Sequence, residues 1–121
     1  MLRGNQPHNN PMWRTQLHDD HGPFDVEYRS AGDWEFFLRC AFGGAQFKKI
    51  NDVLGLYYFN PKGISTNFEN FAWKQEEEKK IYLKYKTMLE KERENEQEDT
   101  FVQPVPTKSD AESSASRRTQ K

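Results

Sequence analysis

The stretch SAGDWEFFLR, residues 30–39, decides the fold, because a one-sided apolar pattern begins in it. Apolar residues recur at the i, i+3, i+4 and i+7 spacing of one helical face, at Trp34, Phe37, Leu38 and Ala41. Gly43 and Gly44 follow, and glycine commonly ends a helix. We therefore predict a helix that begins near Asp33 and ends before Gly43.

Asp33 itself has two interpretations. Ser30 followed three residues later by Asp33 matches a capping box, in which the carboxylate reaches back to the amide of the first cap residue. A carboxylate held at a helix start beside aromatic side chains is also suited to act as a general base, with Trp34 and Phe36 shaping a pocket. Local sequence alone favours the cap, but the two roles are compatible.

Downstream of this helix the apolar period changes. Residues 47–50 and 53–59 are rich in β-branched and aromatic residues, and Asn51 and Asp52 form a turn between them. These runs predict two short strands or one interrupted strand. After a turn at residues 60–63, a long helix is predicted over residues 67–96, with one apolar face made of Ile81, Tyr85, Met88 and Leu89.

The remaining segments are shorter or more polar. Residues 1–10 read as a loop, and Pro11 and Gly22 bracket a short helix or a strand end that runs into one. Residues 98–121 mix Pro, Ser and charged residues without periodicity and are predicted to be disordered. The predicted fold class is α/β, or α+β as an isolated fragment, with short helices, a small sheet of two to three strands and a long C-terminal helix.

Composition limits the function classes. Eighteen Lys and Arg against nineteen Asp and Glu give a net charge of −1, so we expect no nucleic-acid partner. No apolar run is long enough to predict a transmembrane segment. Cys40 is the only cysteine, which excludes an internal disulfide and predicts a core residue in a reducing, cytoplasmic setting.

Two acidic patterns resemble metal ligands. The tetrad His18–His21 has two histidines on one helical face, but its carboxylates point elsewhere, and Asp25 and Glu27 lie in a turn. We interpret both as surface features and predict no metal site. Among the aromatic residues, Trp13 and Trp34 are the candidate contact residues, because each lies next to a loop.

The order of these motifs over residues 11–67 resembles the C-terminal half of the family 2 glycosyltransferases, which have the GT-A fold. The matching stretches are PMWRTQLHDDHGPFD and SAGDWEFFLRCAFGGAQFKKINDVLGLYYFNPKGISTN. The resemblance assigns residues 11–97 to a glycosyltransferase-like portion and residues 1–10 to a loop or a remnant of a preceding half. It implies an acceptor-side fragment of a partial GT-A fold.

In that family an acidic motif supplies the general base of an inverting transfer from a nucleotide sugar to an acceptor hydroxyl. The resemblance implies that Asp33 is this base. It also implies that Trp13, Arg14, Trp34 and Glu35 surround a glycan or lipid-linked acceptor. Asn60 stands near the place where many members carry a histidine linked to the metal or the diphosphate.

The strand-borne Asp-x-Asp motif that binds the nucleotide sugar and metal in that family has no counterpart in the sequence. We therefore expect no cofactor in this chain, Mg or Mn in the complete enzyme, and a separate polypeptide that supplies the donor site. The alternative is a non-catalytic α/β protein-interaction module, whose helix over residues 67–96 docks a partner.

Overall fold

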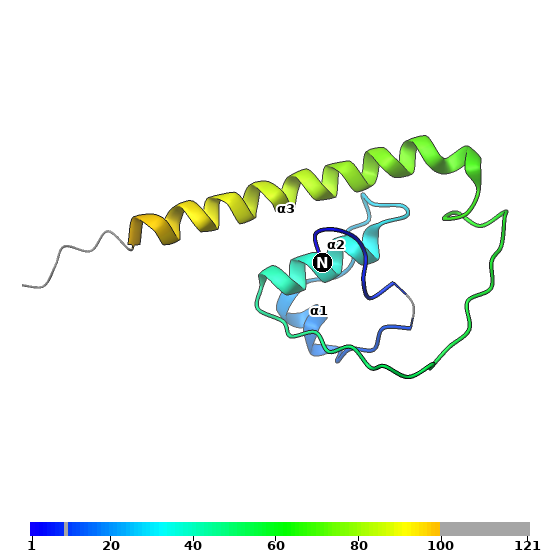
Figure 1. Ribbon diagram of the computed structural model, residues 1–121, viewed down its shortest axis with the longest axis horizontal. Coiled ribbons are helices and arrows are strands. Elements are labelled where there is room, and N and C mark those ends of the chain that lie inside the picture. Colours follow the sequence, from blue (N-terminus) through cyan, green and yellow to red (C-terminus); the bar gives the residue numbers. More distant parts are fainter. Residues whose placement is uncertain (9, 100–121) are drawn as a thin grey trace, which may run out of the picture. The chain divides into compact units, whose positions relative to one another are not determined.

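The computed structural model describes residues 1–8 and 10–99 of the chain, and helices are the only regular secondary structure in these ranges (Figure 1). In chain order they are α1 (Gln16–His21), α2 (Gly32–Phe42), the 3-10 helix η1 (Phe68–Asn70) and α3 (Phe71–Asp99). Residues 1–90 pack as one unit. Residues 91–99 continue α3 and belong to a second unit.

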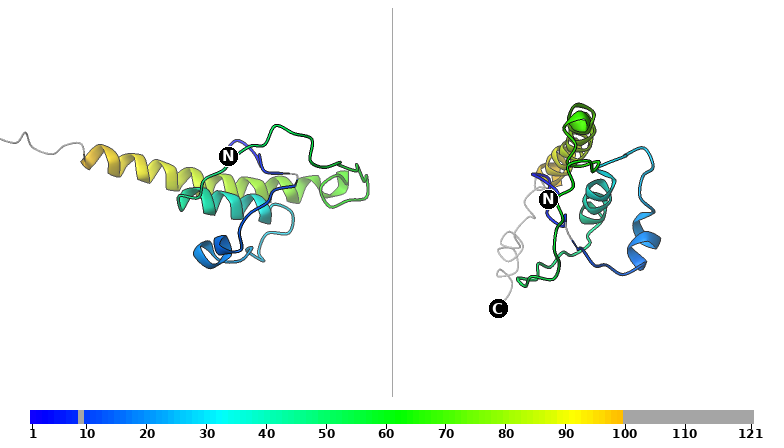
Figure 2. Two further views of the ribbon diagram at one scale, coloured as in Figure 1. Left: turned by 90° about the horizontal axis from the view of Figure 1, so that it is seen from below. Right: turned by 90° about the vertical axis from the view of Figure 1, so that its right-hand side faces the viewer.

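The central helix is α2, which lies between α1 and α3 (Figures 1 and 2). On one side, Trp34 and Leu38 pack with Ile81 and Tyr85 of α3. On another side, Phe36, Phe37 and Cys40 form a second cluster, which Trp13 and Leu17 cover. Because α2 is buried on two sides, it contributes more core residues than the single face that its periodicity predicts.

The predicted bounds of α2 are confirmed, since the helix ends at Phe42 and Gly43 is its C-cap. The short helix predicted between Pro11 and Gly22 begins later, at Gln16. It ends as predicted at Gly22, whose φ of 84° is a conformation that glycine adopts without strain. Cys40 is fully buried, as predicted for a core residue.

The predicted small sheet, and with it an α/β GT-A fold, is wrong for this chain. Residues 45–60 form an extended segment without secondary structure, which runs from the end of α2 toward η1 (Figure 1). A strand needs a neighbour to satisfy its backbone groups, and an isolated hairpin is marginal in water. Within residues 1–8 and 10–99 no second strand is present to supply that neighbour.

The long C-terminal helix is confirmed, with a later end than predicted. Asn67 caps η1 by accepting a hydrogen bond from the amide of Glu69, and α3 then runs from Phe71 to Asp99. Ile81 and Tyr85 face the core, whereas Met88 is partly exposed. The predicted disordered tail falls, from residue 100 onward, outside the described residues.

Within the described ranges, no helix combines the length and the apolar character that a membrane crossing requires.

Candidate functional site

Asp33 lies in the first turn of α2, and its side chain is partly exposed. Its Oδ2 accepts a hydrogen bond from Nδ2 of Asn5 at 2.9 Å, and its Oδ1 accepts one from the amide of Trp34 at 2.7 Å. The carboxylate is therefore held from two directions, and each oxygen keeps a free lone pair. Oδ1 of Asn5 is buried and has no partner among the described residues.

The capping box predicted for Ser30 and Asp33 does not form. The amides that lead into the helix are bound instead by Glu77 of α3, whose carboxylate accepts hydrogen bonds from three consecutive amides, those of Arg29, Ser30 and Ala31, at 2.9, 2.8 and 2.6 Å. A carboxylate there also meets the positive end of the α2 dipole. Glu77 thus binds the amides that precede the helix, whereas Asp33 binds only the first-turn amide of Trp34.

The pKa of Glu77 reflects this environment. Burial acts to raise its pKa, but the hydrogen bonds from Ala31, Arg29 and Ser30 together outweigh burial and lower the pKa below its ordinary value. The carboxylate is therefore charged at neutral pH and fixes α3 to the start of α2.

Glu35 is the centre of a buried polar network made of Glu35, Arg39, Lys84 and Tyr85. Its side chain is 1% exposed. Oε2 accepts from Arg39 at 2.9 Å, and Oε1 accepts from the Tyr85 hydroxyl at 2.6 Å and from Lys84 at 3.4 Å. Burial acts to raise the pKa of Glu35, but the hydrogen bonds from Arg39 and Tyr85 outweigh it and lower the pKa.

The same network reaches α1. The Arg39 guanidinium donates to the carbonyl of His21 at 2.5 Å and to the carbonyl of Pro23 at 2.9 Å. Arg39 thus satisfies carbonyl groups at the end of α1 while it neutralises Glu35. Glu35 joins α1, α2 and α3 in this way, and its buried side chain is inaccessible to an acceptor in the free chain.

The two candidate tryptophans differ in position. Trp34 is buried among Leu38, Ile81 and Tyr85, and its indole N–H donates to the Met1 carbonyl at 3.2 Å. Trp13 is partly buried on Phe37, and its indole N–H donates to His18.

Arg14 is exposed before α1. Of the five predicted site residues, Trp34 and Glu35 are buried in the core next to Asp33 in the sequence. None of the hydrogen bonds or ring contacts of Trp13 involves Asp33.

The tetrad His18–His21 does not converge on one point. The His18 ring stacks on Phe36 with centroids 4.6 Å apart, and its Nδ1 donates to the Gly22 carbonyl. The His21 ring lies against Gly43 instead. Within the described part of the chain, no group of three or more His, Cys, Asp and Glu side chains is arranged to hold a metal ion.

Asp25 and Asn60 have local structural roles. Oδ1 of Asp25 accepts from the amide of Glu27, and Oδ1 of Asn60 accepts from the amide of Lys62. Both are the side-chain bonds of Asx turns. Neither residue shows a structural link to Asp33.

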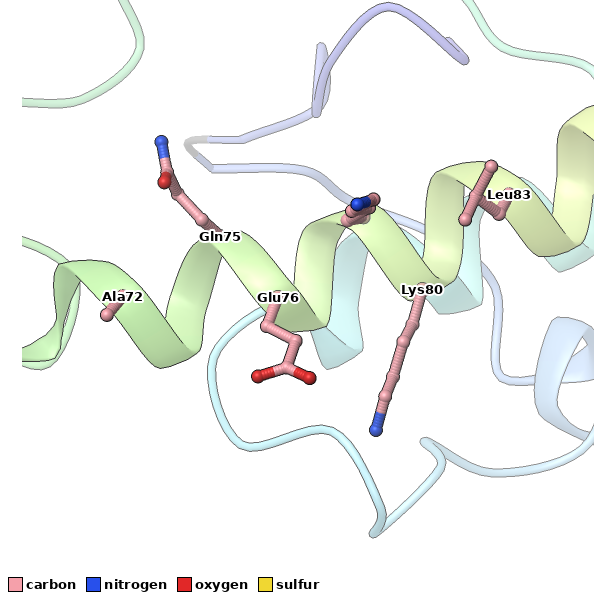
Figure 3. Close-up of a pocket in the computed structure, with 6 residues that line it drawn as sticks. Ala72, Gln75, Glu76, Lys80 and Leu83 are labelled. Atoms are coloured by element: carbon pink, nitrogen blue, oxygen red, sulfur yellow. The ribbon is translucent and has the colours of Figure 1, made fainter.

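A surface hollow of about 490 Å³ lies along α3 (Figure 3). All the side chains that line it come from this one helix: Ala72, Gln75, Glu76, Lys79, Lys80 and Leu83. It contains none of the candidate site residues, and an open hollow on a single helix lacks the convergent polar groups of a binding pocket.

Sequence reasoning missed Glu77 and Asn5. Glu77 belongs to the run EEEKK, which is typical of a solvated helix face. One signal was present, because residues 77, 81 and 85 follow at four-residue intervals and so share the face that packs on α2. Asn5 lies in a polar loop, and nothing in its local sequence indicates a contact with Asp33.

Comparison with known proteins yields no relative: no protein-family model, no curated protein and no solved structure matches the chain. The resemblance to family 2 glycosyltransferases therefore stays a prediction from the sequence.

Proposed function

We propose that this chain is the acceptor-side portion of an inverting nucleotide-sugar glycosyltransferase, and that it works with a separate polypeptide that binds the donor. The observation that carries the proposal is the state of Asp33. Its carboxylate is partly exposed at the start of α2, it is held by Asn5 and Trp34, and the Ser30 amide that a capping box would give it binds Glu77 instead. The proposal concerns these residues and does not include an α/β fold for the chain.

In the proposed reaction, Asp33 takes the proton of an acceptor hydroxyl while that oxygen forms a bond to the anomeric carbon of the donor sugar. The bond from the anomeric carbon to the diphosphate oxygen breaks at the same time, and the nucleoside diphosphate leaves. The described residues do not fit the Mg or Mn expected of the complete enzyme. The metal and the donor site are assigned to the partner.

The non-catalytic interaction module is the rival. It would dock a partner on the apolar face of the long helix, which carries Ile81, Tyr85 and Met88. Ile81 and Tyr85 are buried against α2, so this face is already occupied within the chain. An interaction role would have to use another surface.

Residue-resolved NMR of the isotope-labelled full chain tests the proposal. One titration uses a panel of oligosaccharide acceptors, and a second uses nucleotide sugars with Mn²⁺. We expect saturable shifts at Asp33, Asn5 and the first turn of α2 with at least one acceptor, and no saturable shifts with any donor. Donor binding by the chain alone would contradict the assignment of the donor site to a partner.

The matched variant for the acceptor titration is Asp33→Asn. It should weaken acceptor binding, because a carboxylate accepts a stronger hydrogen bond from a hydroxyl than an amide does. Asp19→Asn, an exposed position on α1, is the control and should leave the shifts unchanged. A panel that leaves the start of α2 unperturbed would count against the acceptor site.

A further inference from the structure

The extended segment carries a continuous run of exposed, mostly apolar residues. Between residues 53 and 59 every residue is exposed, and Val53, Leu56 and Tyr58 are exposed by 90%, 97% and 85%. Exposed apolar runs of this kind mark interaction sites in soluble proteins. The aromatic and β-branched composition of the segment fits a paired strand rather than a solvated loop.

The backbone of the segment is also without partners inside the described chain. No hydrogen bond joins the amides or carbonyls of residues 46–59 to any other described residue. Residues 8 and 10 touch this run at two points. The side-chain amide of Asn10 lies against Gly55, and the His8 ring lies near the Tyr57 ring. An extended backbone with free N–H and C=O groups is a template for an added strand.

The charges beside the segment indicate the kind of partner. Residues 46–63 contain three lysines and one aspartate: Lys48, Lys49, Lys62 and Asp52. All four side chains are exposed. A second copy of the chain is a poor match, because parallel pairing in register places lysine against lysine. Antiparallel pairing centred on Leu56 places Lys48 and Lys49 of each copy near Lys62 of the other, so like charges again meet.

We propose that residues 53–59 dock a separate polypeptide, whose exposed strand pairs with their backbone and whose acidic side chains lie beside Lys48, Lys49 and Lys62. The proposal rests on the proposed function in one respect: we take this polypeptide to be the one that supplies the donor site. The docking itself depends only on the segment. The partner's acidic side chains would attract the three lysines, whereas a second copy would repel them.

Amide hydrogen exchange of the full chain with two synthetic peptides tests the docking. Both peptides alternate valine and threonine; one carries two glutamates at each end, and its twin carries two lysines at each end. We expect the glutamate peptide to slow exchange at residues 53–59 about tenfold more than the lysine peptide. Equal protection by the two peptides, or none from either, would overturn the proposal.

Proline variants separate backbone pairing from apolar contact. Neighbouring amides of an extended chain point to opposite edges, and the added strand pairs with only one edge. Proline removes one amide, so at least one of the variants Leu56→Pro and Tyr57→Pro should abolish the protection. Leu56→Ala and Tyr57→Ala keep the amide and serve as controls. All four variants should keep the far-UV circular dichroism of the helices, since the segment adds no backbone hydrogen bond to them. Undiminished protection in both proline variants would exclude strand addition.

Sedimentation of the chain without peptide checks the second copy. We expect the monomer to persist as concentration rises, with residues 53–59 exchanging freely. A concentration-dependent dimer that protects these residues would replace the proposed partner with a second copy. If neither peptide protects the segment while sugar transfer still depends on Asp33, the docking proposal is rejected and the proposed function stands.

Discussion

At the scale of single residues, the Tyr85 hydroxyl connects the apolar core to the Glu35 network. Its O–H donates to Oε1 of Glu35 at 2.6 Å, and both side chains are buried. Burial, together with this hydrogen bond, raises the pKa of the Tyr85 phenol, so the hydroxyl stays a donor at all ordinary pH values. A hydrogen bond to a buried charge is stronger than one between neutral groups.

Tyr85→Phe should therefore lower the free energy of unfolding by about 1.5–3 kcal/mol, the range for hydrogen bonds to charged groups. Chemical denaturation followed by tryptophan fluorescence measures this change. Tyr82→Phe is the matched control, because Tyr82 lies on the same helix and is partly exposed. Equal effects of the two variants would show that the hydroxyl bond adds nothing.

At the scale of elements, the helices could be predicted because their signals are local. The spacing of Trp34, Phe37 and Leu38 lies within one helix, as does that of Ile81 and Tyr85. The sheet could not be predicted correctly, because pairing of residues 53–59 depends on a second strand that their own composition does not supply. The role of Glu77 at the amides before α2 was missed for the same reason, since Glu77 is 47 residues from Ser30.

Glu77 should make the docking of α3 on α2 dependent on pH. The pKa values of Glu77 and Glu35 are both lowered in the folded chain. As pH falls below about 5, these two carboxylates therefore bind protons more readily in the unfolded chain than in the folded chain. Stability is then fully present above the ordinary glutamate pKa and is lost as pH falls through the lowered values. Denaturation curves between neutral pH and about pH 2 should show this loss.

Glu77→Gln tests the source of that dependence. At neutral pH it should lower the free energy of unfolding by about 1–3 kcal/mol, because the charged acceptor for three amides is lost. Its stability should also fall less steeply in acid than that of the wild type. Glu78→Gln changes an exposed neighbour and should do neither. An acid profile identical in the wild type and Glu77→Gln would exclude Glu77 as the titrating group.

At the scale of the whole molecule, the described chain combines a helical unit with an apolar segment that it does not cover. The place of Asp33 at the start of a helix could be predicted from the sequence, because an acidic residue ahead of an apolar helix is a local pattern. The burial of Glu35 could not, since it depends on hydrogen bonds to Tyr85 of α3 and to other side chains. Under the proposed function, the base lies on this chain and the donor site lies on a partner.

Transfer activity restored by the purified chain tests this central claim most directly. A cell extract that lacks the chain is supplied with labelled nucleotide sugars and the wild-type protein, Asp33→Asn or Asp19→Asn. The fold of Asp33→Asn should persist. Oδ1 of Asn5 has no partner, so a flip of the Asn5 side-chain amide lets this oxygen accept a hydrogen bond from the NH₂ group that the substitution introduces.

We predict that the wild type and Asp19→Asn restore transfer, and that Asp33→Asn lowers the restored rate by about 10²–10⁴-fold, the usual contribution of a general base. Restoration by Asp33→Asn at the wild-type rate, or the same extract activity with and without the wild-type chain, would contradict the account.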